Sequence, residues 1–244
     1  MTRLISTALA ASLLAVPALA QDAVDPGDVI SLDDWNAQRM NTDLGWSVDA
    51  LLDSPVHGEN GDPRIGEVED VLFDPEGNIV SVIAEVGGMI DVGDHHVSVP
   101  WHRVTMMEDT TAIRVPVSED TVSEYDPAEY SGIDGAWLSH VPKPGMDDAD
   151  IARAWRASEF IGDYARLTGE DAPVYYGYVS DIMVQDGEIN ATIIQAGGSY
   201  GGGYYAYPDY TGPDMGWSPG SPYYDLPYPV EDVEQMEPVR PDNM

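Results

Sequence analysis

Branched apolar residues alternate with acidic ones most clearly in RIGEVEDVLFDPEGNIVSVIAEVGG, residues 64–88. Val68 and Asp70 fall on one side of an extended chain, because successive side chains of a strand point to opposite faces. Glu67 and Glu69 fall on the other side. The second half, IVSVIAEV, is apolar at nearly every position, which predicts a strand buried on both faces. DPEGN between them has the composition of a tight turn, so the stretch predicts a β-hairpin.

The same pattern returns in VYYGYVSDIMVQDGEINATIIQAGG, residues 174–198. After a one-residue deletion the two stretches match at Gly66 with Gly177, Val68 with Val179, Asp70 with Asp181, Gly77 with Gly187, Ile79 with Ile189, and Gly87-Gly88 with Gly197-Gly198. Further on, HVSVP (96–100) matches YYAYP (204–208), and VPVSEDTVSEYDP (115–127) matches LPYPVEDVEQMEP (226–238). The offset stays between 108 and 112 throughout. Because chance similarity does not hold register for so long, we infer a tandem repeat.

Short strands and turns fill the rest of each repeat. Further strands are expected in WSVDALLDSPVHG, in HHVSVPW up to Pro100, in AIRVPV and, in the second repeat, in YYDLPY (223–228). About six short strands per repeat is the pattern of a small closed barrel. The expected fold class is therefore all-β, with two tandem small barrels. The expected segments are a flexible acidic stretch at 21–43, a first barrel at 44–130, a linker at 131–157 with a helix from Asp147 to Trp155 capped by Asp147 or Asp148, a second barrel at 158–240, and an insertion loop at 199–222.

The motif residues of the first repeat resemble the PRC-barrel family, which is named for the H subunit of the photosynthetic reaction centre and also occurs in a ribosome maturation factor. The family pattern is found here at Ile65, Gly66, Val68, Asp70, Val71, Gly77, Gly87, Gly88, Val97, Val99, Pro100 and Trp101. The second repeat keeps Gly177, Asp181, Gly187, Gly197, Gly198 and Pro208, while Tyr replaces several of its aliphatic residues. The resemblance implies an assembly or interaction module and brings no catalytic residue with it.

The first twenty residues have the features of a secretory signal peptide. Arg3 supplies a positive charge, LISTALAASLLAV is a short apolar run, and Ala18-Leu19-Ala20 suits a signal peptidase, so cleavage is expected after Ala20. A periplasmic or secreted location follows. The chain has no cysteine, which excludes a lipid anchor on a cysteine at the cleavage site and any disulfide. No later stretch is apolar enough to cross a bilayer, so no transmembrane segment is expected after cleavage.

The charge is strongly negative, with 44 acidic against 10 basic residues and a net charge of −34. Such a chain repels nucleic acid and anionic lipid headgroups. The acidic surface is either a solvated surface suited to a salty environment or a collector of divalent cations or basic partners. Composition alone is compatible with both interpretations of the acidic surface.

Three local patterns invite a chemical interpretation, and each has a structural alternative that we favour. Gly87-Gly88 is followed by a turn and a strand, not by the helix that a phosphate loop needs, so we expect a sharp bend of the sheet. Asp94, His95, His96 and His102 suggest a metal site, but adjacent histidines of a strand point apart. Asp74, Glu76 and Asn78 resemble the opening of a calcium loop, but the glycine comes too early, so we expect a hairpin turn.

Catalytic motifs for hydrolysis or nucleotide binding are absent from the sequence, so we expect no catalytic, cofactor or metal residues and no enzyme. The most unusual composition is GGSYGGGYYAYPDYTGPDMGWSPGSPYYDLPY, which is rich in Tyr, Gly and Pro. Such tyrosines suit protein contact, since they offer a large area at low entropic cost, but they also suit a core of the loop itself or stacking on sugar rings. The possible interaction surface is Tyr200, Tyr204, Tyr205, Tyr210 and Trp217.

The expected function is a non-catalytic binding or assembly module whose partner is another periplasmic or membrane-associated protein. The alternatives are a periplasmic protein that binds a small ligand or divalent cations with its acidic surface, and an enzyme of unknown type.

Overall fold

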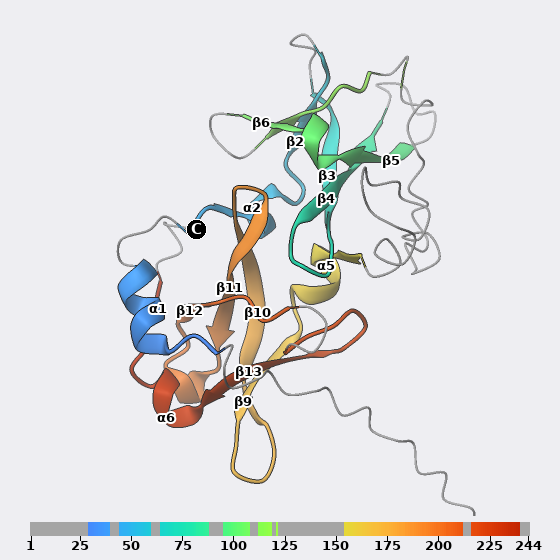
Figure 1. Ribbon diagram of the computed structural model, residues 1–244. Helices are drawn as coiled ribbons and strands as arrows, with labels where there is room; N and C mark the ends of the chain where they lie inside the picture. Colours follow the sequence, from blue (N-terminus) through green and yellow to red (C-terminus); the bar gives the residue numbers. More distant parts are fainter. Residues whose placement is uncertain are drawn as a thin grey trace, which may run out of the picture.

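The protein is mostly β, with two sheets, one of which curls into a half-barrel, and few helices (Figure 1). This computed structural model describes residues 29–39, 44–59, 64–87, 95–107, 112–118, 121, 154–211 and 216–239. The expected signal peptide, the Asp147–Asp148 cap and the first residues of the linker helix lie outside the described residues.

The first sheet contains the hairpin that the alternation predicted. Its strand order is β5-β4-β3-β2-β7-β6, and β8 also pairs with β3. The strands are β2 (Pro55–His57), β3 (Arg64–Phe73), β4 (Ile79–Val86), β5 (His95–Pro100), β6 (Thr105–Met106), β7 (Ile113–Arg114) and β8 (Trp155–Arg156). A 3-10 turn, η2 (Trp101–Arg103), follows β5. The strand β4 is buried at seven of its eight positions, as its continuous apolar run predicts.

The second sheet has the order β12-β11-β10-β9-β13, and β1 also pairs with β10. The strands are β1 (Trp46–Ser47), β9 (Tyr164–Thr168), β10 (Val174–Gln185), β11 (Glu188–Ala196), β12 (Tyr204–Tyr207) and β13 (Tyr223–Pro229). A 3-10 turn, η4 (Gly198–Tyr200), precedes β12, and a helical turn, α6 (Val230–Val233), follows β13. The expected strand at 223–228 is therefore present.

Each half lends its first strand to the sheet of the other half. The strand β1 precedes the first sheet in the chain but pairs with β10, where Trp46 faces Val184. The strand β8 precedes the second sheet but pairs with β3, where Phe73 faces Trp155. A helical turn follows each of these strands, α2 (Val48–Leu51) after β1 and α5 (Ala157–Phe160) after β8, and both turns lie between the sheets in Figure 1.

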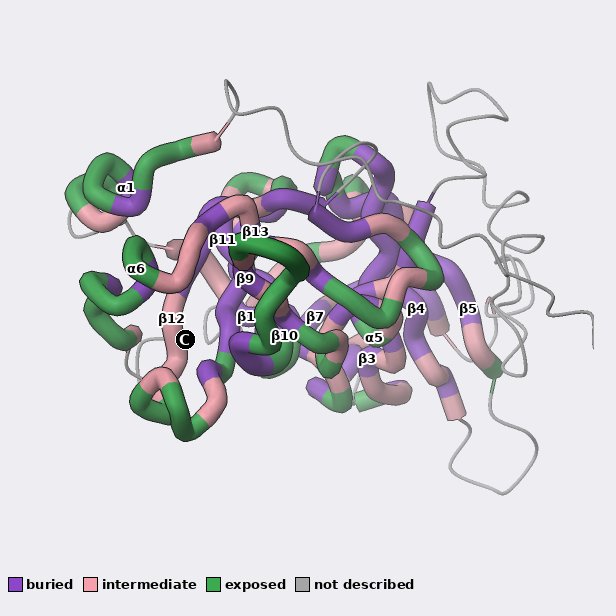
Figure 2. Tube along the Cα trace, turned by 90° about the horizontal axis from the view of Figure 1, so that it is seen from below, coloured by how far each residue is buried: buried purple, intermediate pink, exposed green. Residues whose placement is uncertain are grey.

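The hairpin turns of the two halves also join. The Ile79 amide donates to the Gly187 carbonyl at 2.9 Å, and the Ile189 amide donates to the Gly77 carbonyl at 3.0 Å. Trp155 stacks on Phe73 with 4.9 Å between ring centroids and meets the edge of Trp217 at 4.9 Å. Buried residues of both halves accordingly form one hydrophobic cluster, which follows the strands in Figure 2.

Part of the acidic stretch expected to be flexible is helical. Residues Leu32–Arg39 form α1, in which Leu32 and Trp35 are buried. The Trp35 indole donates to the Ala206 carbonyl at 2.7 Å, and the Tyr228 hydroxyl donates to the Ile30 carbonyl at 2.7 Å. A short stretch with only two apolar anchors carries little periodic signal, because the surface that holds it comes from residues about 170 positions later.

Two further expectations differ from the structure. The linker helix was expected to run to Trp155, but Trp155 lies in β8, because its ring packs on Phe73 and its backbone joins β3. The stretch WSVDALLDSPVHG was expected to hold one short strand, and it forms β1, α2 and β2. Strands of two or three residues are too short to show a period of two. Whether such a segment forms a strand therefore depends on the strand with which it pairs.

Candidate functional site

The motif glycines at the start of each long strand allow a close approach of two backbones. A Cβ on Gly66 would lie 1.8 Å from the Glu85 carbonyl oxygen, and a Cβ on Gly177 would lie 2.1 Å from the Gln195 carbonyl oxygen. No side chain fits there without separating the strands. These glycines therefore serve the sheet rather than a ligand.

Asp70 and Asp181 bind the helical turn that follows the exchanged strand. The Asp70 carboxylate accepts hydrogen bonds from the Ser158 hydroxyl at 2.5 Å and the Ser158 amide at 3.2 Å. The Asp181 carboxylate accepts from the Ser47 hydroxyl at 2.6 Å and the Asp49 amide at 2.9 Å. Burial raises the pKa of both carboxyls, and these hydrogen bonds oppose that rise. Each aspartate thus ties its own half to the other.

The remaining motif residues lie at turns and strand ends. Gly77 and Gly187 have φ values of 80° and 87°, in the left-handed region that glycine favours. Gly87 follows β4, Gly197 precedes η4, and Gly198 begins it. Pro100 ends β5 and Pro208 follows β12, whereas Gly88 lies outside the described residues. The described positions among these therefore shape turns and strand ends.

The histidines near the end of the first hairpin do not converge. His96 Nδ1 lies 2.7 Å from a carboxylate oxygen of Glu69, and the neighbouring His95 is exposed. His102 is exposed in η2, and Asp94 lies outside the described residues. Within the described ranges, no three His, Asp or Glu side chains come together as a metal site requires.

The DPEGN stretch is a hairpin turn closed by its own aspartate. The Asp74 carboxylate accepts hydrogen bonds from the amides of Glu76 and Asn78 at 3.1 and 2.7 Å. The Asn78 side-chain amide donates to it as well. The oxygen atoms that a calcium ion would need are therefore used within the turn.

Of the five residues of the expected interaction surface, Tyr210 and Trp217 pack inward, so these two do not belong to an exposed surface. Tyr210 is 1% exposed and Trp217 is fully buried. The Trp217 indole donates to Asp163 at 2.7 Å, and the Tyr210 hydroxyl lies 2.7 Å from that of Tyr228. The other three, Tyr200, Tyr204 and Tyr205, are half-buried against the core. Tyr210 and Trp217 therefore supply volume to the hydrophobic cluster.

A different set of tyrosines is exposed on the outer side of the second sheet. Tyr164, Tyr175, Tyr178 and Tyr223 are 45%, 44%, 42% and 40% exposed, and we call them the tyrosine face. Tyr178 pairs with Tyr164 across β10 and β9, and Tyr164 pairs with Tyr223 across β9 and β13. Ring centroids lie 5.2 Å apart in the first pair and 6.2 Å in the second. Three tyrosines therefore form a row across three strands.

A second row lies beside the first. Tyr175 pairs with Arg166, and Arg166 pairs with Asp225. The Arg166 guanidinium makes two hydrogen bonds to the Asp225 carboxylate, at 2.6 and 2.7 Å, and its central carbon lies 3.9 Å from the Tyr223 ring centroid. A hydrogen bond with Tyr178 raises the pKa of Tyr175 to about 12, so this hydroxyl stays neutral at ordinary pH. The face combines exposed aromatic rings with one neutralised ion pair.

Sequence reasoning missed this face because a β-bulge builds it. Tyr175 and Tyr178 are three residues apart, so strict alternation would place them on opposite faces. The register of β10 against β9 shifts between Tyr175 and Gly177, which brings both rings to the same side. The sequence signal that could have indicated the face is the alternation in YARLT. Its Ala165 and Leu167 are buried, so Tyr164 points to the opposite, exposed side of the strand.

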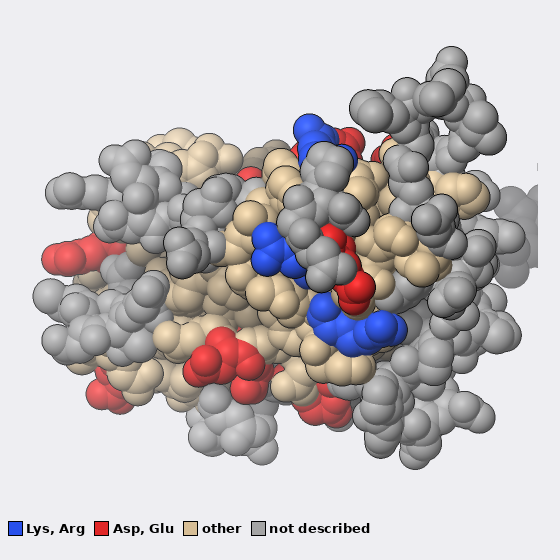
Figure 3. Space-filling model, turned by 90° about the horizontal axis from the view of Figure 1, so that it is seen from above, with Lys and Arg blue, Asp and Glu red and all other residues tan. Residues whose placement is uncertain are grey.

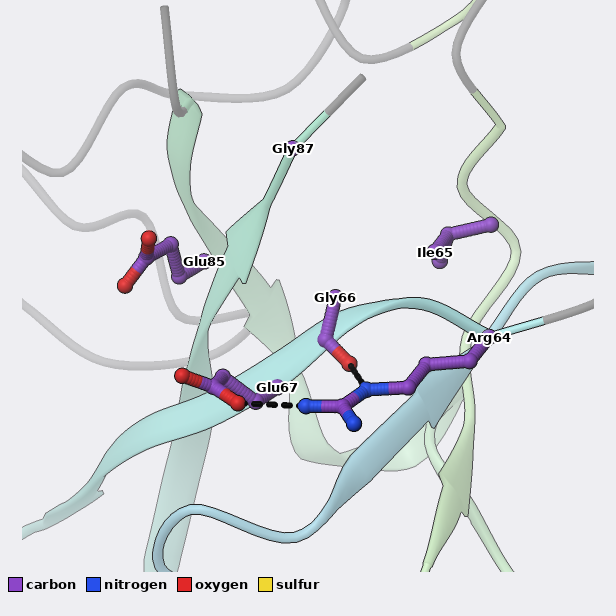
Figure 4. Close-up of a pocket in the computed structure, with 6 residues that line it drawn as sticks. All are labelled: Arg64, Ile65, Gly66, Glu67, Glu85 and Gly87. Atoms are coloured by element: carbon purple, nitrogen blue, oxygen red, sulfur yellow. Dashed lines mark hydrogen bonds and ion pairs between the residues drawn. The ribbon is translucent and has the colours of Figure 1, made fainter. Parts of the chain in front are cut away.

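Two small pockets formed by described residues could be considered as ligand sites. The first, of about 230 Å³, is lined by Arg64, Ile65, Gly66, Glu67, Glu85 and Gly87. Figure 4 shows that the Arg64 guanidinium already binds the Gly66 carbonyl and the Glu67 carboxylate. The second, of about 340 Å³, is lined by Tyr176, Ser199, Tyr200, Tyr205, Val233 and Glu234, and the Tyr176 hydroxyl is bonded to Tyr207 at 2.7 Å. Neither pocket brings a nucleophile and a base together.

Three of the described arginines are engaged by carboxylates. Arg64 pairs with Glu67, Arg156 with Glu159, and Arg166 with Asp225. On the side of the molecule drawn in Figure 3, blue and red side chains lie next to one another instead of forming a basic patch. In the portion of the chain that is described, no helix combines the length and apolarity needed to cross a membrane.

Comparison with known proteins finds a similarity in the first half of the chain. No curated protein matches the chain. Residues 47–122 match the family model of the PRC-barrel domain, and this match runs from α2 through β7.

Proposed function

We propose that this protein is a non-catalytic binding or assembly module that contacts another protein through the tyrosine face. The observation that carries the proposal is the exposure of four tyrosines in register on one sheet, with no described element over them. Soluble proteins rarely leave adjacent large aromatic side chains in water unless a partner covers them. Tyrosine is enriched at protein interfaces, since its ring buries a large area while its hydroxyl remains solvated.

The second half, in this proposal, is a PRC-type barrel as well, so that two tandem copies form the scaffold. Matched hydrogen bonds support it: the Asp53 amide donates to the Val68 carbonyl at 2.8 Å, and the Gly162 amide donates to the Val179 carbonyl at 2.8 Å. Asp53 and Gly162 both have positive φ, at 61° and 103°. Equivalent backbone geometry at equivalent repeat positions is what a duplicated unit would retain.

The module acts in the periplasm or outside the cell in this account. The support is the sequence of residues 1–20, whose positive start, apolar run and Ala18-Leu19-Ala20 site fit cleavage after Ala20. A partner in the same compartment, or at the outer side of a membrane, follows from that location.

Capture from an envelope extract tests the proposal. The full chain, a Tyr164→Ser/Tyr178→Ser variant and an Ile30→Ser control are immobilised, and bound proteins are quantified by mass spectrometry. Ile30 is a matched control because it is 39% exposed and its backbone bonds to the buried Tyr210 and Tyr228 side chains, not to the tyrosine face. A partner retained by the full chain and the control but lost from the tyrosine variant is expected. Equal capture by all three would remove the tyrosine face from the function.

A further inference from the structure

Three tyrosines of the face form a triangle of partly exposed rings. The centroid distances are 5.2 Å for Tyr164 to Tyr178, 5.7 Å for Tyr175 to Tyr178 and 6.0 Å for Tyr164 to Tyr175. The corresponding angles between ring planes are 39°, 74° and 69°, so the rings are tilted against one another instead of stacked. Exposed aromatic rings grouped in this way offer electron-rich surface to a cation that approaches from solvent.

The fourth tyrosine already holds a cation. The Arg166 guanidinium lies over the Tyr223 ring at 3.9 Å while Asp225 neutralises it through two hydrogen bonds. This is a cation–π contact between an arginine and a tyrosine of the same sheet face. It shows, on the molecule itself, the geometry in which this surface accommodates a guanidinium.

The net charge of the half that carries the tyrosine face complements a cationic partner. Residues 154–211 and 216–239 hold thirteen Asp and Glu residues against two arginines, Arg156 and Arg166. Both arginines are paired, with Glu159 and Asp225. An approaching anion would therefore meet net negative charge, whereas an approaching cation is attracted. A second copy of this chain, with its net charge of −34, would be repelled at low salt.

We propose that Tyr164, Tyr175 and Tyr178 receive Lys or Arg side chains of a basic polypeptide segment, and this inference rests on the proposed function of the tyrosine face. The rings contribute cation–π contacts and the acidic surroundings contribute long-range attraction. Ring contacts set the affinity at moderate salt, and the acidic surroundings raise the association rate at low salt.

Fluorescence anisotropy with two defined peptides tests this. One peptide carries evenly spaced arginines in a Gly-Ser background, and the other has citrulline, the neutral isostere of arginine, at the same positions. The full chain is compared with Tyr164→Phe/Tyr178→Phe, which keeps the aromatic rings, and with Tyr164→Leu/Tyr178→Leu, which keeps apolar area but no ring. Ile30→Ser serves as the control for an exposed apolar residue elsewhere.

The full chain, the Phe variant and the control are expected to bind the arginine peptide with affinities within about threefold of each other. The Leu variant should lose roughly five- to thirtyfold, the sum of two cation–π contacts, and this ratio should persist as salt is raised. The citrulline peptide should bind much more weakly. Equal affinity of the Leu and Phe variants, or of the two peptides, would overturn the proposal.

The test separates this inference from the proposed function. If envelope capture depends on the tyrosine face but the arginine peptide does not bind, the face is an interface for a partner of another chemistry and the basic class is wrong. Face-dependent dimerisation in sedimentation, or face-dependent binding of a neutral glycan without peptide binding, would contradict the basic class as well. If neither capture nor peptide binding depends on the face, both proposals fail.

Discussion

At the scale of single residues, folding clearly changes the pKa of the Asp209 carboxyl. Burial raises the pKa of Asp209 to about 7, although Thr211 donates hydrogen bonds to it at 2.8 and 3.1 Å. It lies at the junction of the halves, where a Cβ on Gly77 would be 3.5 Å from its carboxylate. The protein therefore binds a proton there more tightly when folded than when unfolded.

We predict that this aspartate makes the folded state less stable as pH rises. The stabilising contribution of its protonated form is complete below the unfolded pKa, about 3.9, and is lost as pH rises through the folded pKa near 7. Asp209→Asn keeps a neutral side chain at every pH. Urea unfolding at pH 5 and pH 8 should show a smaller loss of stability in the variant, by about 1–3 kcal/mol. An identical pH dependence in both proteins would contradict the raised pKa.

The paired glycines give a second prediction at this scale. Gly66→Ala and Gly177→Ala should each lower the free energy of unfolding by about 1–3 kcal/mol or more, because the new methyl group meets a carbonyl of the neighbouring strand. Gly198→Ala is the matched control, since nothing lies within 4 Å of its Cβ position. Thermal melting of the three variants measures the differences. If the melting temperature of the control falls as far as those of the other two variants, the strands do not approach each other as described.

At the scale of elements, Asp70 and Asp181 are predicted to act as equivalent ties between the halves. Alanine at either position leaves a serine hydroxyl and a backbone amide of the opposite half without their acceptor. Each change should cost about 2–3 kcal/mol of unfolding free energy. Asp171→Ala, in the exposed β9–β10 loop, should stay within about 0.5 kcal/mol of the original.

Double-mutant cycles check the assignment of these ties. Asp70→Ala should couple to Ser158→Ala, and Asp181→Ala should couple to Ser47→Ala, since each pair shares a hydrogen bond. The crossed pairs should be additive. Additivity within the direct pairs would mean that the aspartates stabilise only their own strands.

Elements that depend on local patterns could be predicted from the sequence, and elements that depend on distant partners could not. The hairpin of β3 and β4 follows from its alternation, its apolar run and the turn around Gly77. The exchange of β1 and β8 does not, because strands of two residues carry no period and their partners lie far along the chain. The tyrosine face needed both a bulge in β10 and the parallel pairing of β13 with β9.

At the scale of the whole molecule, the exchanged strands and shared core make the two halves one folding unit. Phe73 of one half packs on Trp155 of the other, and one hydrophobic cluster includes both. We predict a single calorimetric unfolding transition, with calorimetric and van't Hoff enthalpies that agree. Asp70→Ala and Asp181→Ala should lower its midpoint without dividing it. Two resolved transitions, each shifted by only one variant, would show that the halves fold independently.

The central claim is that this scaffold presents the tyrosine face to a partner protein. Its most direct test places a photo-crosslinking amino acid at position 178, on the face. A second protein carries it at position 30, which is similarly exposed and whose backbone carbonyl binds the buried Tyr228 side chain. Both proteins are irradiated in the native envelope. The account predicts a discrete crosslinked partner from position 178 and none of that mass from position 30. Identical patterns from both positions, or none from position 178, would contradict it.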